Sequence, residues 1–344
     1  MRPHHLLLTL LAQHVSAQYN FTIPPMLRFQ CSQLVIDRID PLVNPGLIPS
    51  PHLHQIVGGN SFNATLSHDL PSVSTCTSCT FAEDFSNYWT AVMYFRARNG
   101  TYKRVPQFTS EGLAGKGGIT VYYIPDAENK TNVTAFKKGF RMLAGDAGAT
   151  TTGSARKVCH RCMPEGADAI TLNCAAPDSE AFPTGMCGGG IRSVITFPTC
   201  WDGVNLDSPD HRSHMAYSAG VVGNDVGPTG KCPASHPVVV PQVMYEVMWD
   251  TRQFNDPAIW PEDGSQPLVW STGDVNGFSQ HGDYVFGWKD DTLQRAMDSR
   301  CTGDKCTELK YQDTEEAMKC NVPTAVQEEV DGWMTSLPGN RMPF

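Results

Sequence analysis

Twelve cysteines constrain most strongly what this chain can fold into. Their number is even, and the first of them is Cys31. In an oxidising compartment an even number predicts up to six disulfides, whereas cytosolic cysteines are kept reduced. The compartment therefore decides how the cysteines are interpreted.

Residues 1–17 have the features of a secretory signal peptide. A weakly basic start precedes the apolar run at residues 6–12, and small residues lead up to Ala17, after which we expect cleavage. No later stretch is apolar enough to span a membrane. We therefore expect a secreted, extracellular glycoprotein. Five N-glycosylation sequons begin at Asn20, Asn63, Asn99, Asn129 and Asn132.

Two CxxC pairs, Cys76–Cys79 and Cys159–Cys162, allow a second interpretation as the halves of a zinc ribbon. The gap between them is far longer than the usual spacing of about 15 to 20 residues, and extracellular thiols are usually oxidised. Disulfides are therefore the preferred interpretation. Further cysteines, expected to staple a polar C-terminal tail to the body, are Cys301, Cys306 and Cys320.

The 30 glycines and 25 prolines are spread evenly, which is typical of many turns between short strands. We predict a mainly β fold: a large β-sandwich of jelly-roll type with long loops, a few short helices and multiple disulfides. One β-rich domain is expected over residues 18–300, followed by a disulfide-stapled tail at 301–344. Asn99-Gly100 predicts a hairpin turn that brings residues 105–108 back along the preceding strand. The predicted strands are 88–96, 119–124, 191–197, 238–243, 245–249 and 284–288, and the predicted helices are 290–299 and 314–320.

Six histidines form four short polar clusters beside glycine or proline. Imidazole is the commonest metal ligand and also titrates near neutral pH, so their convergence predicts metal binding, proton transfer or both. Each cluster also has an ordinary interpretation, as loop histidines that bond backbone or nearby carboxylates. The clusters are Pro51-His52-Leu-His54, Asp210-His211-Arg-Ser-His214, Cys232-Pro-Ala-Ser-His236 and Gln280-His281-Gly-Asp283. The metal ligands that we predict for one zinc, copper or manganese ion are His52, His54, His214 and His281.

An enzymatic interpretation adds further residues. A histidine could abstract the proton next to a uronate carboxylate that an arginine neutralises, and aromatic rings could stack on sugars. The chain has 26 basic and 35 acidic residues and no Lys/Arg cluster, which argues against nucleic acid as a partner. The predicted catalytic residues are His54, His214, His281, Asp283 and Arg38. The predicted substrate-binding residues are Tyr88, Trp89, Trp201, Arg212 and Trp288.

Several of these segments resemble a family of secreted, mainly fungal proteins that share a domain of unknown function, often joined to a WSC carbohydrate-binding module. The resemblance spans about residues 27–290 and implies a secreted protein of the fungal wall or plant-biomass environment. It implies no reaction, and we expect no WSC module in this chain. The matching segments run from Arg38 to Gly46, His52 to Gly58, Asp84 to Thr90, Phe197 to Gly203, Asp210 to Tyr217, Cys232 to Pro237 and His281 to Trp288.

Three functions follow from these features. The first is a carbohydrate-active protein whose histidine-rich cleft acts on a cell-wall or plant-biomass polysaccharide, in a lyase-like or metal-assisted reaction. The second is a non-catalytic cell-wall or glycan-binding protein with structural histidines. The third is a secreted metal-binding protein without turnover. His54→Ala separates the three functions. It should abolish turnover in the first case and metal binding in the third, and in the second case it should leave glycan retention intact.

Overall fold

The structure is a computed structural model that describes residues 25–108, 116–125, 132–153, 157–166, 174, 176–219, 228, 230–303 and 305–344. The predicted signal peptide and the sequon residues Asn20 and Asn129 lie outside the described residues.

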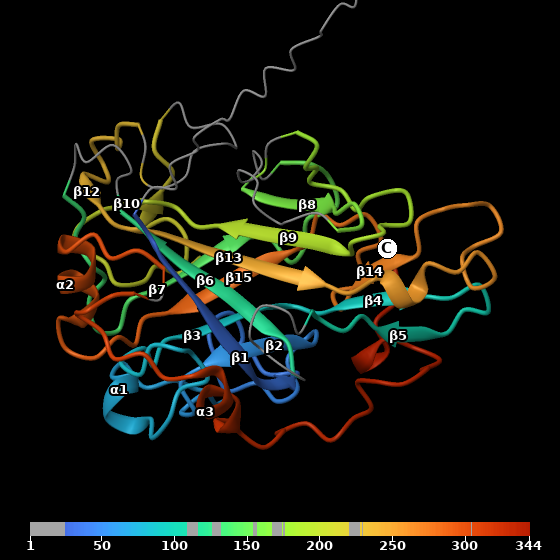
Figure 1. Ribbon diagram of the computed structural model, residues 1–344, viewed down its shortest axis with the longest axis horizontal. Helices are drawn as coiled ribbons and strands as arrows, with labels where there is room; N and C mark the ends of the chain where they lie inside the picture. The colour runs from blue at the N-terminus through green and yellow to red at the C-terminus, as the bar shows by residue number, and fades with distance from the viewer. Residues whose placement is uncertain are drawn as a thin grey trace, which may run out of the picture.

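Nine antiparallel strands form the main sheet (Figure 1). In order across the sheet they are β7 (Arg141–Gly145), β15 (His281–Val285), β3 (Asn87–Ala91), β2 (His54–Gly58), β1 (Leu27–Asp37), β6 (Gly118–Ile124), β13 (Gln242–Trp249), β9 (Ile191–Thr196) and β8 (Val158–Cys162).

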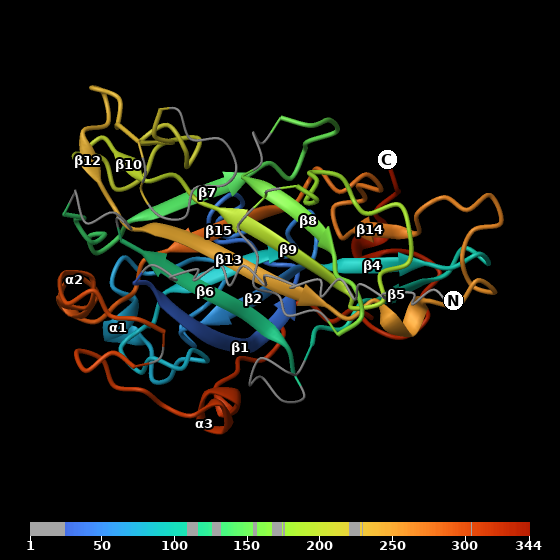
Figure 2. The same ribbon diagram turned by 45° about the horizontal axis from the view of Figure 1, so that its top comes forward.

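Strand β1 belongs to both halves of this sheet. Residues 27–32 pair with β6, residues 33–37 pair with β2, and the register is irregular between Gln33 and Val35. The halves curl toward each other until β7 contacts β9, which nearly closes the sheet into a barrel (Figure 2). The prediction of a mainly β fold is confirmed. A jelly roll has two separate sheets that face each other. In this protein the two facing layers are halves of one curled sheet, because the 11-residue strand β1 is long enough to join them.

Aromatic rings from both halves fill the core between them. Tyr88 of β3 contacts Tyr245 of β13 edge to face and stacks on Tyr284 of β15. Gly282 of one half packs closely against the other half: a Cβ there would lie 3.0 Å from the rings of Phe197 and Tyr245. The missing side chain therefore lets the two halves pack together.

The remaining elements are short. The predicted hairpin at Asn99-Gly100 is confirmed, although its second strand is residues 102–104 and not 105–108. One small sheet contains β10 (Cys200–Trp201), β11 (Met215–Ala216) and β12 (Val238–Val239), and the other contains β4 (Met93–Arg96), β5 (Tyr102–Arg104) and β14 (Leu268–Trp270). The helices are α1 (Leu70–Val73), α2 (Thr292–Asp298) and α3 (Thr314–Lys319), with 3-10 turns η1 (Arg252–Phe254) and η2 (Pro338–Asn340). Within the described ranges, none of the helices has the length and apolar character of a membrane span.

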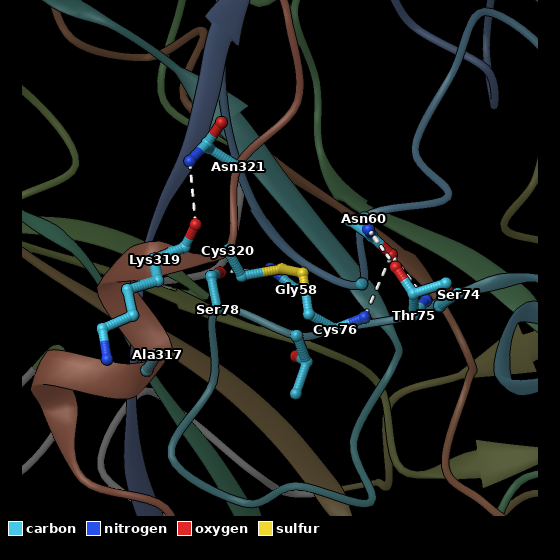
Figure 3. Close-up of a disulfide and its surroundings, with 12 residues drawn as sticks. Gly58, Asn60, Ser74, Thr75, Cys76, Ser78, Ala317, Lys319, Cys320 and Asn321 are labelled. Carbon is cyan, nitrogen blue, oxygen red and sulfur yellow. Dashed lines mark hydrogen bonds between the residues drawn. A yellow bond between two sulfur atoms is a disulfide. The ribbon is translucent and has the colours of Figure 1, made fainter.

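All twelve cysteines are paired, and each member of a CxxC motif bonds outside its own motif. Cys76–Cys320 joins the segment before β3 to the end of α3, and so ties the tail to the body (Figure 3). Cys301–Cys306 closes only a short local loop. The other disulfides are Cys31–Cys79, Cys159–Cys174, Cys162–Cys187 and Cys200–Cys232.

A buried carboxyl group begins a chain of hydroxyls inside the barrel. Asp84 accepts hydrogen bonds from the Tyr88 hydroxyl at 2.6 Å and the Ser86 amide at 3.0 Å. Tyr88 in turn bonds Tyr123, which donates to Tyr284. Burial raises the pKa of Asp84 to about 7, although the hydrogen bonds from Ser86 and Tyr88 oppose this shift.

Asp84→Asn is expected to gain stability over the wild type as pH rises. The folded-state pKa of Asp84 lies above its unfolded value, so the wild type loses stability from about pH 4 up to about pH 7. The asparagine cannot ionise, and the difference in unfolding free energy should grow by about 2 kcal/mol between pH 5 and pH 7. Urea unfolding at several pH values measures this difference. A difference that does not change with pH contradicts the prediction.

Candidate metal centre

Strand register brings two of the predicted histidines into one row of the sheet. His54 begins β2 and pairs with Ala91 of β3. His281 begins β15, and the next residue, Gly282, pairs with Thr90 of β3. Extending this register by one residue sets His281 level with Ala91, so the two histidines are two strands apart, with Cα atoms about 10 Å from each other. Imidazoles that lean toward each other can meet across that distance.

His52 completes the group from the loop before β2. Its Nε2 lies 3.2 Å from Nε2 of His281, and its ring centroid lies 4.2 Å from that of His54. One ligand atom from each of the three histidines falls within 4.8 Å of the others. The exposed fractions are 6% for His52, 0% for His54 and 2% for His281, so the group is closed to bulk water.

Hydrogen bonds to backbone carbonyls orient two of the rings. Nδ1 of His54 donates to the Ile39 carbonyl at 3.2 Å, and Nδ1 of His281 donates to the Ser279 carbonyl at 2.9 Å. A carbonyl only accepts, so each Nδ1 carries the proton and each Nε2 keeps its lone pair. Nε2 of His54 is buried without a hydrogen-bond partner among the described residues. This arrangement is typical of histidines that bind metal through Nε2.

The spacing suits a metal ion. Zinc binds imidazole nitrogen at about 2.0–2.1 Å, and tetrahedral geometry then holds two such nitrogens about 3.4 Å apart. The 3.2 Å between the Nε2 atoms of His52 and His281 is close to this value. A second group of potential ligands, Asp84 with Cys31 and Cys79, does not qualify, because its cysteines form a disulfide.

The charges around the group favour a cation. Burial lowers the pKa of His54 to about 3 and, with the nearby His54, that of His281 to about 4, so both are neutral ligands at pH 7. Asp283 lies with its Oδ2 3.7 Å from Nε2 of His281, and neither carboxylate oxygen has a hydrogen bond within the described chain. Burial and Asp40 raise the pKa of Asp283 well above its usual value. A metal ion at the histidines would favour the ionised form of this carboxyl group.

The structure does not bring His214 into the group. Its Nδ1 bonds the Ser208 hydroxyl at 2.9 Å and its Nε2 donates to the Arg141 carbonyl at 2.8 Å, so both ring nitrogens are in use. Arg141 and Gly145 are the two ends of β7, and Gly145 pairs with His281. Four strand residues, about 13 Å, therefore separate the two positions. His214 instead fastens its loop to β7.

The predicted arginines have different surroundings. Arg38 forms an ion pair with Glu328 of the tail and donates to the Ser50 carbonyl, so its guanidinium joins the tail to the body. Arg212 donates to the carbonyl of Gly145, beside His281. Its positive charge lowers the pKa of both His281 and Asp283, although less than burial affects either group. Of these two predicted arginines, Arg212 therefore lies at the histidine group.

The predicted sugar-stacking aromatics lie inside the protein. Their exposed fractions do not exceed 3%, so none presents a ring face at the surface. Trp201 donates its indole N–H to the Asn205 carbonyl at 2.6 Å. These residues pack the core: Tyr88, Trp89, Trp201 and Trp288.

One acidic residue of the site was missed from the sequence. Asp40 accepts hydrogen bonds from the amides of Leu42 and Val43 at 3.1 and 3.0 Å, and it interacts electrostatically with His281. Burial raises its pKa. The sequence did offer a signal for Asp40, which stands in an apolar run between Ile39 and Pro41-Leu42. A carboxylate that is buried in such a run needs a polar or charged partner.

The fold and the histidine group define a mainly β, disulfide-bonded domain with a buried three-histidine group that could hold a metal ion. The family model described as "Domain of unknown function (DUF1996)" matches residues 40–288, and the chain belongs to this family. The family resemblance seen in the sequence is thereby confirmed. Comparison with curated proteins and with solved structures gave no match.

Proposed function

We propose that this chain is a secreted glycoprotein that binds one divalent transition metal through His52, His54 and His281. The observation that carries the proposal is the convergence of three buried imidazoles, two of them held by backbone carbonyls with Nε2 left for a ligand. Imidazole ligands suit zinc and copper, whereas a carboxylate such as that of Asp283 suits manganese. Asp283 supplies the compensating negative charge beside the metal.

Secretion is supported by three features. The N-terminal sequence resembles a cleavable signal peptide, and six disulfides are typical of an oxidising compartment. The sequon residues that the structure describes, Asn63, Asn99 and Asn132, are exposed, as glycan attachment requires. The family resemblance supports a role in the fungal wall or plant-biomass environment as part of this proposal.

Elemental analysis of the secreted protein tests metal binding. We expect about one equivalent of zinc, copper or manganese in the wild type, and none in His52→Ala/His54→Ala. The matched control is His211→Ala/His236→Ala, which removes two histidines that bond Asp207 and the Ser213 carbonyl outside the group. This control should keep its metal. Metal retained by the first variant, or absent from the wild type, would refute the proposal.

A second candidate function is metal-assisted action on a polysaccharide, and one observation favours it. A pocket of about 700 Å³ shares Gly145 and Arg212 with the wall of the histidine group. The test is release of products from wall and plant polysaccharides by metal-loaded protein, compared with His54→Ala. Equal release by both proteins rejects metal-assisted turnover.

A further inference from the structure

The pocket lies beside the metal centre, between the loop that follows β7 and the segment around β11. It holds about 700 Å³, which is the size of a ligand site for a small molecule or a few sugar units. Its charged and hydroxyl-bearing lining residues are Asp146, Thr150, Thr151, Thr152, Lys157, Glu180, Arg212 and Tyr217.

Gly145 makes the pocket and the metal centre neighbours. It lines the pocket, and a Cβ at this position would lie 2.4 Å from the Gln280 carbonyl oxygen and 2.8 Å from Cα of His281. Its φ of +78° also disfavours any other residue. The backbone of residue 145 therefore lies between the pocket and the strand that carries His281.

Arg212 connects the two sites electrostatically. It lines the pocket, donates to the Gly145 carbonyl, and acts on His281 and Asp283. Within the described residues its Nε–H has no acceptor. This Nε–H is buried, whereas the Arg212 side chain as a whole is half-buried and lines the pocket. A guanidinium at a pocket wall is suited to bind a carboxylate, because its donors match the two oxygens.

The other lining groups suit a sugar. Tyr217 keeps 39% of its surface exposed, while its hydroxyl donates to the Thr196 carbonyl. Lys157 lies over the Tyr217 ring at 5.3 Å and adds a second positive charge. Threonine hydroxyls and the carboxylates of Asp146 and Glu180 supply partners for sugar hydroxyls. A ligand that carries both an acid group and several hydroxyls could contact the basic, the hydroxyl and the carboxylate side chains of this pocket.

We propose that this pocket binds an acidic saccharide, whose uronate carboxylate pairs with Arg212 next to the metal centre. The proposal deepens the proposed function and rests on it in treating the pocket as the ligand site of that centre. The saccharide contacts need Arg212, whereas the metal needs the three histidines. The two can therefore be tested separately.

Isothermal titration with a trisaccharide of galacturonic acid, and with a neutral trisaccharide of glucose, tests the pocket. Arg212→Gln should weaken binding of the acidic trisaccharide about tenfold or more and leave the metal content unchanged. Arg252→Gln is the matched control, because Arg252 pairs with Asp250 outside this pocket. It should bind the acidic trisaccharide as the wild type does. Thermal melting of both variants verifies folding.

Each outcome has a separate meaning. Tighter binding of the acidic than of the neutral trisaccharide, lost in Arg212→Gln alone, supports the inference. Equal binding by wild type and Arg212→Gln, or none by the metal-loaded wild type, overturns it and leaves metal binding intact. Arg212-dependent binding in protein that never contains metal supports the saccharide site and refutes the proposed metal function.

Discussion

Replacing Cys76 and Cys320 together by alanine is expected to lower the free energy of unfolding by about 5 kcal/mol. This disulfide spans 244 residues, and a longer loop restricts the unfolded chain more. It also holds α3 against β1, where the Ser32 hydroxyl donates to the Ala317 carbonyl at 3.3 Å. Urea unfolding of the oxidised proteins measures the loss.

The control is Cys301→Ala/Cys306→Ala, whose disulfide spans only 5 residues. The same chain-entropy relation predicts a loss of about 2 kcal/mol for this variant. The difference between the variants, rather than either value alone, isolates the contribution of loop length. Equal losses would show that local contacts, and not the restricted unfolded chain, determine the effect.

Loading the metal-free protein with zinc is expected to raise its free energy of unfolding by about 4 kcal/mol when free zinc exceeds its dissociation constant about 1,000-fold. The folded chain presents three neutral imidazoles beside the buried carboxylate of Asp283, whereas the unfolded chain does not assemble them. Urea unfolding at pH 7, with and without a chelator, measures this gain.

His54→Ala should lose the gain, because it removes the buried Nε2 that lacks a partner among the described residues. His236→Ala, which changes a histidine bonded to the Ser213 carbonyl, should keep it. Equal stabilisation of the two variants by zinc would place the metal elsewhere on the chain.

The sequence identified most chemical groups of the candidate site but not which of them meet. His52 and His54 were paired from their spacing, and His281 was included because glycine and aspartate follow it. His214 was included by the same reasoning, yet the structure places it at the other end of β7. Spacing along the chain describes one segment at a time, whereas a ligand set depends on pairing between distant strands.

The aromatic residues show the same limit. A tryptophan beside an aspartate has the same local pattern in a sugar site and in a core, and burial alone distinguishes the two. Strand β1 was not predicted, although it joins the two halves of the sheet. Its first six residues, 27–32, do alternate between apolar and polar side chains, which was the available signal. The alternation breaks between Gln33 and Val35, where the strand changes its partner from β6 to β2.

The sequence by itself determined the mainly β fold, the pairing of all cysteines into disulfides, the family, and the histidines able to bind metal. These follow from composition, cysteine number and short motifs, which need no knowledge of contacts. Only the tertiary structure decided that one sheet curls on itself, that three histidines converge, and that Arg212 joins them to a pocket. The physical reason is that strand register and burial arise from contacts between residues far apart in the chain.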